Sequence, residues 1–284
     1  MRSNTLLSCR WTKLLWPIAL SSLLWGNSLH AVSSSSSAAC AKPLYLTFDT
    51  GHMGVAPFIA QVLNRQEVKV TFFVAHELTQ EGDGSLGVHW QKWWQERAQE
   101  GHSFASHTLD HVYWVSDVKE DTKQPNSSRF WVKPSAGPLK GQKLLWSSKE
   151  YCQEIQDANE RIKAITSQAP LPLFRAPGGK TSPALLAASK ACGFMHVGWS
   201  SAGFLGDELP SDQYPNPMLL KKALSNIKSG DILMAHLGIW SRSDPWATGV
   251  LEPLIVGLKA KGFCFKSLET HPSYAVWISN HSVQ

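Results

Sequence analysis

Five charged or titratable side chains follow apolar, strand-like runs that lie far apart in the chain. They are Asp49 after "PLYLTF", His107 and His111 in "SHTLDH", Arg175 in "LPLFRAP" and His236 in "DILMAH". A carboxylate can take a proton from water, an imidazole can give up a proton or bind a metal, and an arginine can hold a carboxylate ionised. If the fold brings these groups together, they form one site.

Short β-type runs alternate with helix-type segments from residue 43 onward, which predicts a parallel sheet with helical crossovers. Both a closed barrel and an open doubly wound sheet fit this alternation. In either fold, functional side chains lie just beyond the carboxyl ends of the strands. The expected strands are 43–48, 68–75, 102–106, 171–175, 194–199, 231–235 and 262–268.

Three helix starts can be read from the sequence. Ser147 with Glu150 forms a capping box, and Ser182-Pro183 and Asn216-Pro217 are start signals. Residues 246–261 read less clearly as a helix, because Pro253 interrupts them. The segment 115–147 breaks the alternation, being rich in Lys, Ser, Pro and Gly. We predict that it is a loop insertion over one face of a domain covering residues 40–284.

The N-terminal segment, residues 1–39, has the order of a secretory signal peptide: basic residues, a short apolar run "LLWPIALSSLLW", then small and polar residues. The expected cleavage site follows Ala31 or Ala39, so the mature protein would be secreted or periplasmic. A lipoprotein with Cys40 as acyl site fits less well, since "SAAC" lies far from the apolar run. No membrane anchor or binding module is expected after residue 270.

Composition supports a globular protein with a small charge. The chain has 27 basic and 22 acidic residues, and removal of residues 1–31 takes away three basic ones, leaving 24 − 22 = +2. With no Lys/Arg patch, we expect no nucleic-acid partner. The four cysteines outside the predicted leader are expected to be buried small hydrophobic residues, with disulfides as the alternative; they are Cys40, Cys152, Cys192 and Cys264.

Each candidate residue also has a purely structural interpretation. Asp49 could cap a helix beginning near Gly54, and Arg175 could form a structural ion pair. His236 could be a hydrogen-bonded core histidine. His107 and His111 are four residues apart, a spacing that would point both rings the same way on a helical turn and could grip a metal.

The order of the motifs favours function. "TFDTG", "SHTLDH", "FRAPGG", "GWSSAG" and "ILMAH" occur in that order over residues 42 to 270. This order resembles the polysaccharide deacetylase (NodB-homology) family, whose pattern is TFDDG, H-S/T-x-x-H, R-x-P-aromatic, a Trp-containing segment and L-x-H. The resemblance implies a distorted (β/α) barrel of about seven parallel strands.

The resemblance also implies the roles of the site residues. Asp49 would be the catalytic base, His236 the general acid, and Arg175 the residue that keeps Asp49 ionised and in position. His107 and His111 would bind a divalent metal, with Zn²⁺ preferred because it accepts imidazole and few ligands. In such a site the metal polarises the amide and activates water.

Three further residues would contact the substrate. Met234 stands where the family has a leucine against the acetyl methyl group, a backbone N–H near Gly178 would face the oxyanion, and Trp199 would offer its ring to a sugar.

The sequence departs from the family pattern at the site. Thr50 replaces the second aspartate, a metal ligand; Gly178 replaces the aromatic residue; and Ala202 stands near the position of an aspartate that partners the arginine. We expect His52 or the Thr50 hydroxyl to complete the metal sphere.

These residues predict an exported metal-dependent hydrolase that removes N-acetyl groups from an amino-sugar polymer such as peptidoglycan, an exopolysaccharide or a chitin-like chain. The alternative is a catalytically impaired relative that binds glycans through its tryptophans. An unrelated glycosidase would need a second carboxylate, for which Asp110 and Asp207 are the candidates.

Overall fold

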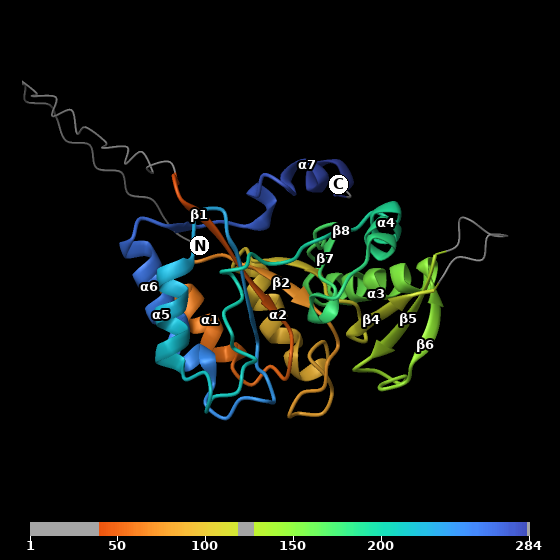
Figure 1. The fold of residues 1–284 in the computed structure, drawn as a ribbon, viewed down its shortest axis with the longest axis horizontal. Helices are drawn as coiled ribbons and strands as arrows, with labels where there is room; N and C mark the ends of the chain where they lie inside the picture. The colour runs from red at the N-terminus through yellow and green to blue at the C-terminus, as the bar shows by residue number, and fades with distance from the viewer. Residues whose placement is uncertain (1–39, 119–127, 283–284) are drawn as a thin grey trace, which may run out of the picture. The chain divides into compact units, whose positions relative to one another are not determined.

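All seven predicted strands form, and they join in one parallel sheet. The computed structural model describes residues 40–118 and 128–282, so the predicted signal peptide lies outside the described residues. The strand order is β10-β1-β2-β3-β7-β8, with β9 on the other side of β1. The sheet curls into a half-barrel (Figure 1), which confirms the predicted fold class and excludes the open doubly wound sheet.

The elements keep to the predicted alternation of strands and helices. In chain order they are β1 (Pro43–Asp49), α1 (Ala56–Arg65), β2 (Thr71–Val74), η1 (Val88–Trp90), α2 (Gln91–Gln99), β3 (Ser103–Ser106), β4 (Val112–Asp117), β5 (Arg129–Pro134), β6 (Leu144–Ser147), α3 (Ser148–Thr166), β7 (Leu173–Phe174), η2 (Pro177–Gly179), α4 (Pro183–Ala191), β8 (Met195–His196), α5 (Asn216–Asn226), β9 (Ile232–His236), η3 (Ala247–Leu251), α6 (Glu252–Ala260), β10 (Cys264–Phe265), η4 (Leu268–Thr270) and α7 (Ala275–His281).

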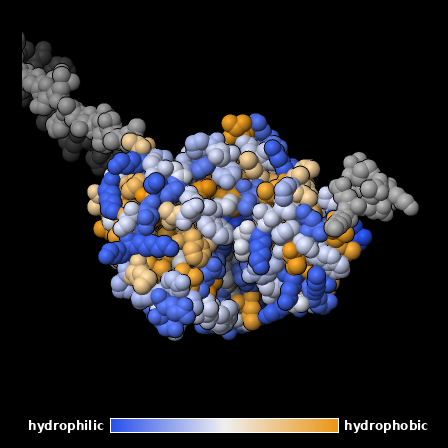
Figure 2. Space-filling model, viewed as in Figure 1, coloured by the Kyte–Doolittle hydropathy of each residue, from blue (hydrophilic) through white to orange (hydrophobic). Residues whose placement is uncertain are grey.

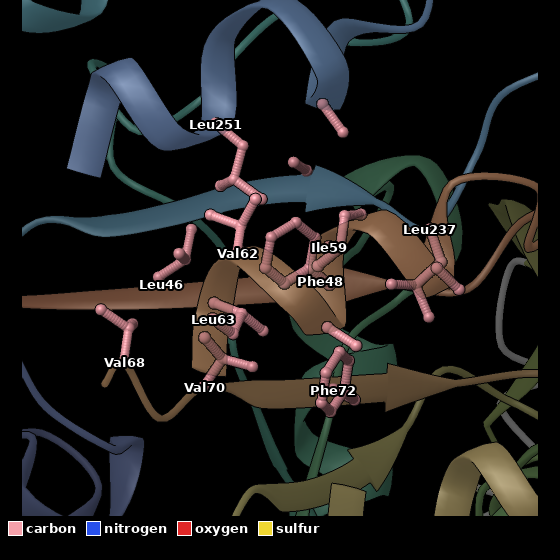
Figure 3. Packing of buried hydrophobic residues seen from close by; sticks show 14 of the residues in the cluster. Leu46, Phe48, Ile59, Val62, Leu63, Val68, Val70, Phe72, Leu237 and Leu251 are labelled. Atoms are coloured by element: carbon pink, nitrogen blue, oxygen red, sulfur yellow. The ribbon is translucent and has the colours of Figure 1, made fainter. Parts of the chain in front are cut away.

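Alternate side chains of β1 enter two different cores, since successive residues of a strand point to opposite faces. Leu46 and Phe48 pack outward against α1, as Figure 3 shows. Tyr45 belongs to a second cluster inside the half-barrel, together with Phe73 and Ile232. Asp49 lies four residues after Tyr45, and this spacing puts its carboxylate on the inner face at the carboxyl end of the strand.

The predicted helix starts are confirmed. Ser147 and Glu150 form a full capping box at α3, and the Ser182 hydroxyl accepts a hydrogen bond from the N–H of Leu185 at the start of α4. Helix α5 begins at Asn216. Near Pro253 the helix is irregular, with a π-helical turn preceding α6. Proline has no N–H to give to the preceding turn, and π-helical turns are one way in which helices accommodate such a defect.

The predicted loop insertion at 115–147 is instead largely an antiparallel sheet, with the order β4-β5-β6. Along β5 the side chains alternate, and Phe130 and Val132 are fully buried in a cluster that includes Tyr151 of α3. The segment was predicted to be a loop because it is rich in Lys, Ser, Pro and Gly, a composition that made the alternation hard to recognise in the sequence. The sheet lies at the opposite end of the domain from α1, α5 and α6 (Figure 1).

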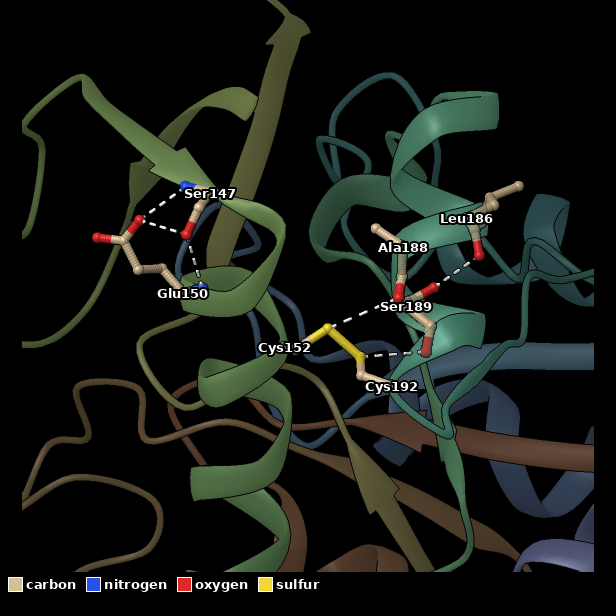
Figure 4. The surroundings of a disulfide bond; sticks show 7 residues. All are labelled: Ser147, Glu150, Cys152, Leu186, Ala188, Ser189 and Cys192. Carbon is tan, nitrogen blue, oxygen red and sulfur yellow. Dashed lines mark hydrogen bonds between the residues drawn. A yellow bond between two sulfur atoms is a disulfide. The ribbon is translucent and has the colours of Figure 1, made fainter. Parts of the chain in front are cut away.

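The expectation of unpaired cysteines is wrong, because two disulfides form. Cys152 of α3 bonds to Cys192 at the end of α4 (Figure 4), and Cys40 bonds to Cys264 in β10. The pairs are 40 and 224 residues apart in sequence, a separation from which pairing could not be inferred. A disulfide at Cys40 also leaves no thiol for acylation.

None of the helices within residues 40–118 and 128–282 has the length and apolarity needed to cross a bilayer. The face seen in Figure 2 is mostly hydrophilic, with hydrophobic residues scattered over it. On this face, therefore, apolar residues do not form one continuous surface.

The α3–α4 disulfide gives a first testable prediction. The double variant Cys152→Ala/Cys192→Ala loses a covalent crosslink across 40 residues. We expect its free energy of unfolding to fall by about 2–4 kcal/mol, because the unfolded chain gains conformational freedom. Denaturant unfolding of the variant and the wild-type protein measures the difference. In the presence of a reductant the two curves should coincide; coincidence without reductant would show that the crosslink does not form.

Candidate active site

A buried ion pair joins β1 to the end of β7. The Nη1 of Arg175 donates to Oδ1 of Asp49 at 2.5 Å, and neither side chain is more than 3% exposed. The other guanidinium N–H groups donate to the carbonyls of Val197 and Gly198 at 3.1 and 3.3 Å and to the Thr47 hydroxyl at 3.0 Å. Arg175 therefore finds hydrogen-bond partners without a second carboxylate.

Asp49 is not a helix cap, since α1 begins after Val55, which makes no side-chain cap. Burial on its own would raise the pKa of Asp49, but the charge and hydrogen bond of Arg175, with the charge of His236, outweigh it and hold the pKa below its usual value. The carboxylate is therefore ionised at neutral pH and able to accept a proton.

His107 and His111 lie on a turn after β3 rather than on the helical turn that their spacing suggested. Thr108 and His111 have left-handed backbone conformations, with φ of 59° and 47°. The Thr108 hydroxyl stabilises the turn by accepting a hydrogen bond from the N–H of Val112 at 2.7 Å. The turn still brings the two rings together, with centroids 4.8 Å apart.

The hydrogen bonds of the two histidines fix which ring nitrogen carries the proton. The Nδ1–H of His107 donates to the carbonyl oxygen of Arg175 at 2.9 Å. The Ser135 hydroxyl donates to the carbonyl of His111 at 3.1 Å, so its oxygen accepts from Nδ1–H of His111 at 2.5 Å. In the neutral form of each ring the lone pair is consequently on Nε2, the arrangement typical of metal-binding histidines.

Each of these Nε2 atoms faces a carboxylate. Nε2 of His107 is 3.6 Å from Oδ2 of Asp49, and Nε2 of His111 is 4.0 Å from Oε1 of Glu77. Burial lowers the pKa of His107 to about 4, which keeps this ring neutral at physiological pH. Among the described residues, no three His, Cys, Asp or Glu side chains are already arranged around one point as a complete metal site.

Glu77 was missed by the sequence analysis. Burial would raise the pKa of Glu77, but the neighbouring His111 and His107, together with the Thr50 hydroxyl, lower it. The same hydroxyl accepts from the N–H of Ala75 at 3.0 Å. A signal was present, because Glu77 follows the predicted strand 68–75 just as the other candidates follow theirs.

His236 lies beside Asp49, since the two residues are register partners of β9 and β1. Its Nδ1 is 3.1 Å from both carboxylate oxygens of Asp207, and its backbone N–H donates to Asp207 at 2.6 Å. Burial would lower the pKa of His236, but the charge and hydrogen bond of Asp207, followed by the charge of Asp49, raise it to about 9. His236 is therefore protonated at neutral pH.

The model of the family described as "Polysaccharide deacetylase" matches residues 36–197. The chain belongs to this family. It is a hydrolase of the polysaccharide deacetylase type.

Relatives of this deacetylase are similar at low identity over most of the chain. A peptidoglycan-N-acetylglucosamine deacetylase of Bacillus cereus is 26% identical over 230 residues, covering 79% of this chain and 85% of its own. A family 4 acetyl xylan esterase from Clostridium thermocellum, in complex with a cobalt ion, has a TM-score of 0.58 at 19% identity and covers 83% and 91% of the two chains. A family pseudoenzyme from Bacillus anthracis has a TM-score of 0.56 at 18% identity and covers 81% and 65%.

Two consecutive glycines shape one wall of the deacetylase pocket. A Cβ on Gly178 would lie 2.9 Å from the Tyr113 ring, and a Cβ on Gly179 would lie 2.6 Å from the Trp199 ring. Both glycines have positive φ, near 63° and 65°. The aromatic residue that the family carries at Gly178 is thus incompatible with Tyr113 in its present position.

The other predicted pocket residues lie on or beside β9. Met234 is buried at 2% exposure, on the same side of the strand as His236. Its N–H donates to the carbonyl of Gly203 at 2.8 Å, which attaches the loop containing Ala202 to the strand. The carboxylate of that loop, Asp207, contacts His236 rather than the arginine.

His52 lies on the His236 side of the pocket. Its Nδ1 accepts from the N–H of Gly54 at 3.0 Å, and its ring is 4.7 Å from that of Trp240. Together with Asp207 and His236 it lines a cavity of about 40 Å³. Among the contacts of the described residues, none joins His52 to the histidine pair.

The contact between Asp207 and His236 yields a second prediction. Asp207→Asn removes the main charge that stabilises the imidazolium, so we expect the pKa of His236 to fall well below 9. NMR titration of the imidazole signals measures this directly. Glu208→Gln, which removes a more weakly acting charge, should lower the pKa less. An unchanged titration in Asp207→Asn would contradict the proposed electrostatic role of Asp207.

Proposed function

We propose that this protein is an exported, metal-dependent deacetylase that removes N-acetyl groups from an amino-sugar polymer. The observation that carries the proposal is the pairing of Asp49 with His236 on adjacent strands. The pKa of Asp49 is lowered and that of His236 is raised. At neutral pH the site therefore holds a proton acceptor, Asp49, beside a proton donor, His236.

In the proposed reaction Asp49 accepts a proton from the attacking water, whose oxygen forms a bond to the acetyl carbon. His236 donates its proton to the amine nitrogen as the carbon–nitrogen bond breaks, and acetate and a free amine result. A divalent cation would supply a Lewis acid that polarises the amide carbonyl and makes water more acidic. Arg175 keeps Asp49 ionised and directed at the water.

The histidine pair supports metal dependence. His107 and His111 present Nε2 lone pairs, and their Nδ1–H groups are held by a carbonyl and a hydroxyl. Imidazoles with such outer partners suit Zn²⁺, which is our preferred metal. These two histidines would hold the metal through Nε2.

A cavity next to the histidine pair supports a glycan substrate. It has a volume of about 480 Å³ and reaches Ser135, the hydrogen-bond partner of His111. Its walls combine aromatic and basic side chains, which are suited to stacking and hydrogen bonding with sugars; they include Tyr113, Trp114, Lys133, Lys140 and Lys180. Relatives are named as deacetylases of peptidoglycan and of chitooligosaccharides. We propose a related N-acetylglucosamine polymer here.

Acetate release from N-acetylglucosamine oligomers and from peptidoglycan tests the proposal. We expect release by the wild-type protein, and a loss of about 100-fold or more in kcat for Asp49→Asn and for His236→Gln, since each removes a proton-transfer group. Activity should fall as the pH rises through about 9, where His236 loses its proton. If a protein with bound metal releases no acetate from either substrate, the proposed reaction is wrong.

The alternative is a relative that binds glycans without cleaving them. Thr50 provides no carboxylate to a metal, and one structural neighbour is described as a pseudoenzyme. In that case the protein would bind the same oligomers, neither Asp49→Asn nor His236→Gln would alter acetate levels, and no metal would be retained. The glycosidase reading has less support, because Asp207 is engaged with His236.

Export is supported by two observations. Residues 1–39 have signal-peptide order, and two disulfides are stable in an oxidising compartment. We expect protein recovered from the periplasm or medium to begin between Val32 and Ala41, as N-terminal sequencing would show. Intact Met1 on protein from the cytoplasm would contradict export.

A further inference from the structure

The Thr50 side chain is short and carries no charge at the place where the family has its second aspartate. It is fully buried, and its hydroxyl accepts from the N–H of Ala75 at 3.0 Å. The hydroxyl is therefore already engaged by the backbone, and it lies near enough to Glu77 to help lower the pKa of that carboxyl.

The backbone just before Glu77 is attached to the histidine turn. The N–H of His76 donates to the carbonyl of Leu109 at 2.6 Å, between the two histidines in sequence. The N–H of Glu77 donates to the Ser85 hydroxyl at 2.9 Å, and the carbonyl of Glu77 accepts from the N–H of Ser85 at 2.8 Å. The first bond ties the backbone next to Glu77 to the histidine turn, and the other two tie Glu77 itself to the loop at Ser85.

The Glu77 carboxylate faces the free lone pair of His111. Oε1 of Glu77 and Nε2 of His111 are 4.0 Å apart, too far for a hydrogen bond. Two ligands held at 2.0–2.2 Å in a tetrahedral zinc site are about 3.3–3.6 Å apart. The Glu77 side chain is 21% exposed, and a shift of about 0.4–0.7 Å would bring the two atoms into that range.

We infer that Glu77 is the third protein ligand of the metal, taking the place of the aspartate that Thr50 replaces. The inference rests on the metal dependence of the proposed function and names this chain's own ligand. A set of two histidines and one carboxylate keeps the charge of a two-histidine, one-aspartate site. Three imidazoles, with His52 as the third, would leave one more positive charge on the metal.

Metal affinity of the full mature protein tests the inference without reference to activity. After removal of metal with a chelator, Zn²⁺ affinity is measured by competition with a chromophoric chelator, and Co²⁺ binding by its absorption spectrum. We expect Glu77→Ala to weaken Zn²⁺ binding by more than about 100-fold, beyond the range for outer-shell partners. Glu77→Gln preserves the side-chain shape and serves if the alanine variant is unstable.

Two control variants separate coordination from other effects. Glu208→Gln removes an exposed carboxylate whose charge reaches His236 and Tyr113. His52→Ala removes the alternative ligand. Both should change Zn²⁺ affinity by less than about tenfold, the lower limit for outer-shell partners. His107→Ala should abolish binding.

Moving the carboxylate back to position 50 gives the most specific test. Thr50→Asp in the Glu77→Ala background should recover at least about tenfold of the lost Zn²⁺ affinity and restore the Co²⁺ spectrum. If Glu77 acted only on folding or solubility, a carboxylate at position 50 would not restore Zn²⁺ affinity and the Co²⁺ spectrum together.

The outcomes distinguish this inference from the proposed function. Unchanged Zn²⁺ affinity in both Glu77 variants, a large loss in His52→Ala, or a wild-type protein that takes up no metal would each overturn the inference. If acetate is released while the Glu77 variants bind metal normally, the function stands and the ligand assignment fails. If Glu77 is needed for metal but no acetylated glycan yields acetate, the ligand assignment stands and the function fails.

Discussion

The ion pair of Asp49 and Arg175 is the interaction on which the site depends. Both side chains are buried, and burying two charges is costly unless they are well paired and fully hydrogen-bonded. Arg175 meets this condition through Asp49, the Thr47 hydroxyl and two backbone carbonyls. Its own carbonyl oxygen holds Nδ1–H of His107. One residue at the end of β7 therefore positions both the candidate base and a candidate metal ligand, so the two cannot be moved independently.

Three neighbouring groups of the site, Asp49, His107 and His236, have different protonation states at neutral pH. Asp49 is held ionised by the arginine, His107 is kept neutral by burial, and His236 is kept protonated by Asp207. Each state is set by a different cause: an opposite charge, desolvation, and a charge combined with a hydrogen bond. Because the causes are separate, acid, base and ligand can coexist within a few ångströms, which hydrolysis of an amide requires.

Much of the fold and part of the candidate site could be predicted from the sequence. The other features could not be predicted, for physical reasons. Strand periodicity and strand-end residues are local signals, so the sheet and the position of Asp49 at its edge were predictable. The turn around Thr108 has left-handed residues that no spacing rule reveals. Glu77, Asp207 and the cysteine pairs act through contacts with residues distant in sequence, and their partners emerge from the closed fold alone.

Two departures from the family pattern are matched by groups that come from elsewhere in the chain. Gly178 lacks the aromatic side chain of the family, and the ring of Tyr113 in β4 occupies the space next to it. The Tyr113 ring packs edge-on against His111, with ring centroids 5.0 Å apart. Thr50 supplies no carboxylate, and the carboxylate of Glu77 lies 4.0 Å from Nε2 of His111. A pocket in which a catalytic role had decayed would not need either replacement to face the same histidine. That both do so favours a site whose shape and charge have been kept while the residues that supply them have changed.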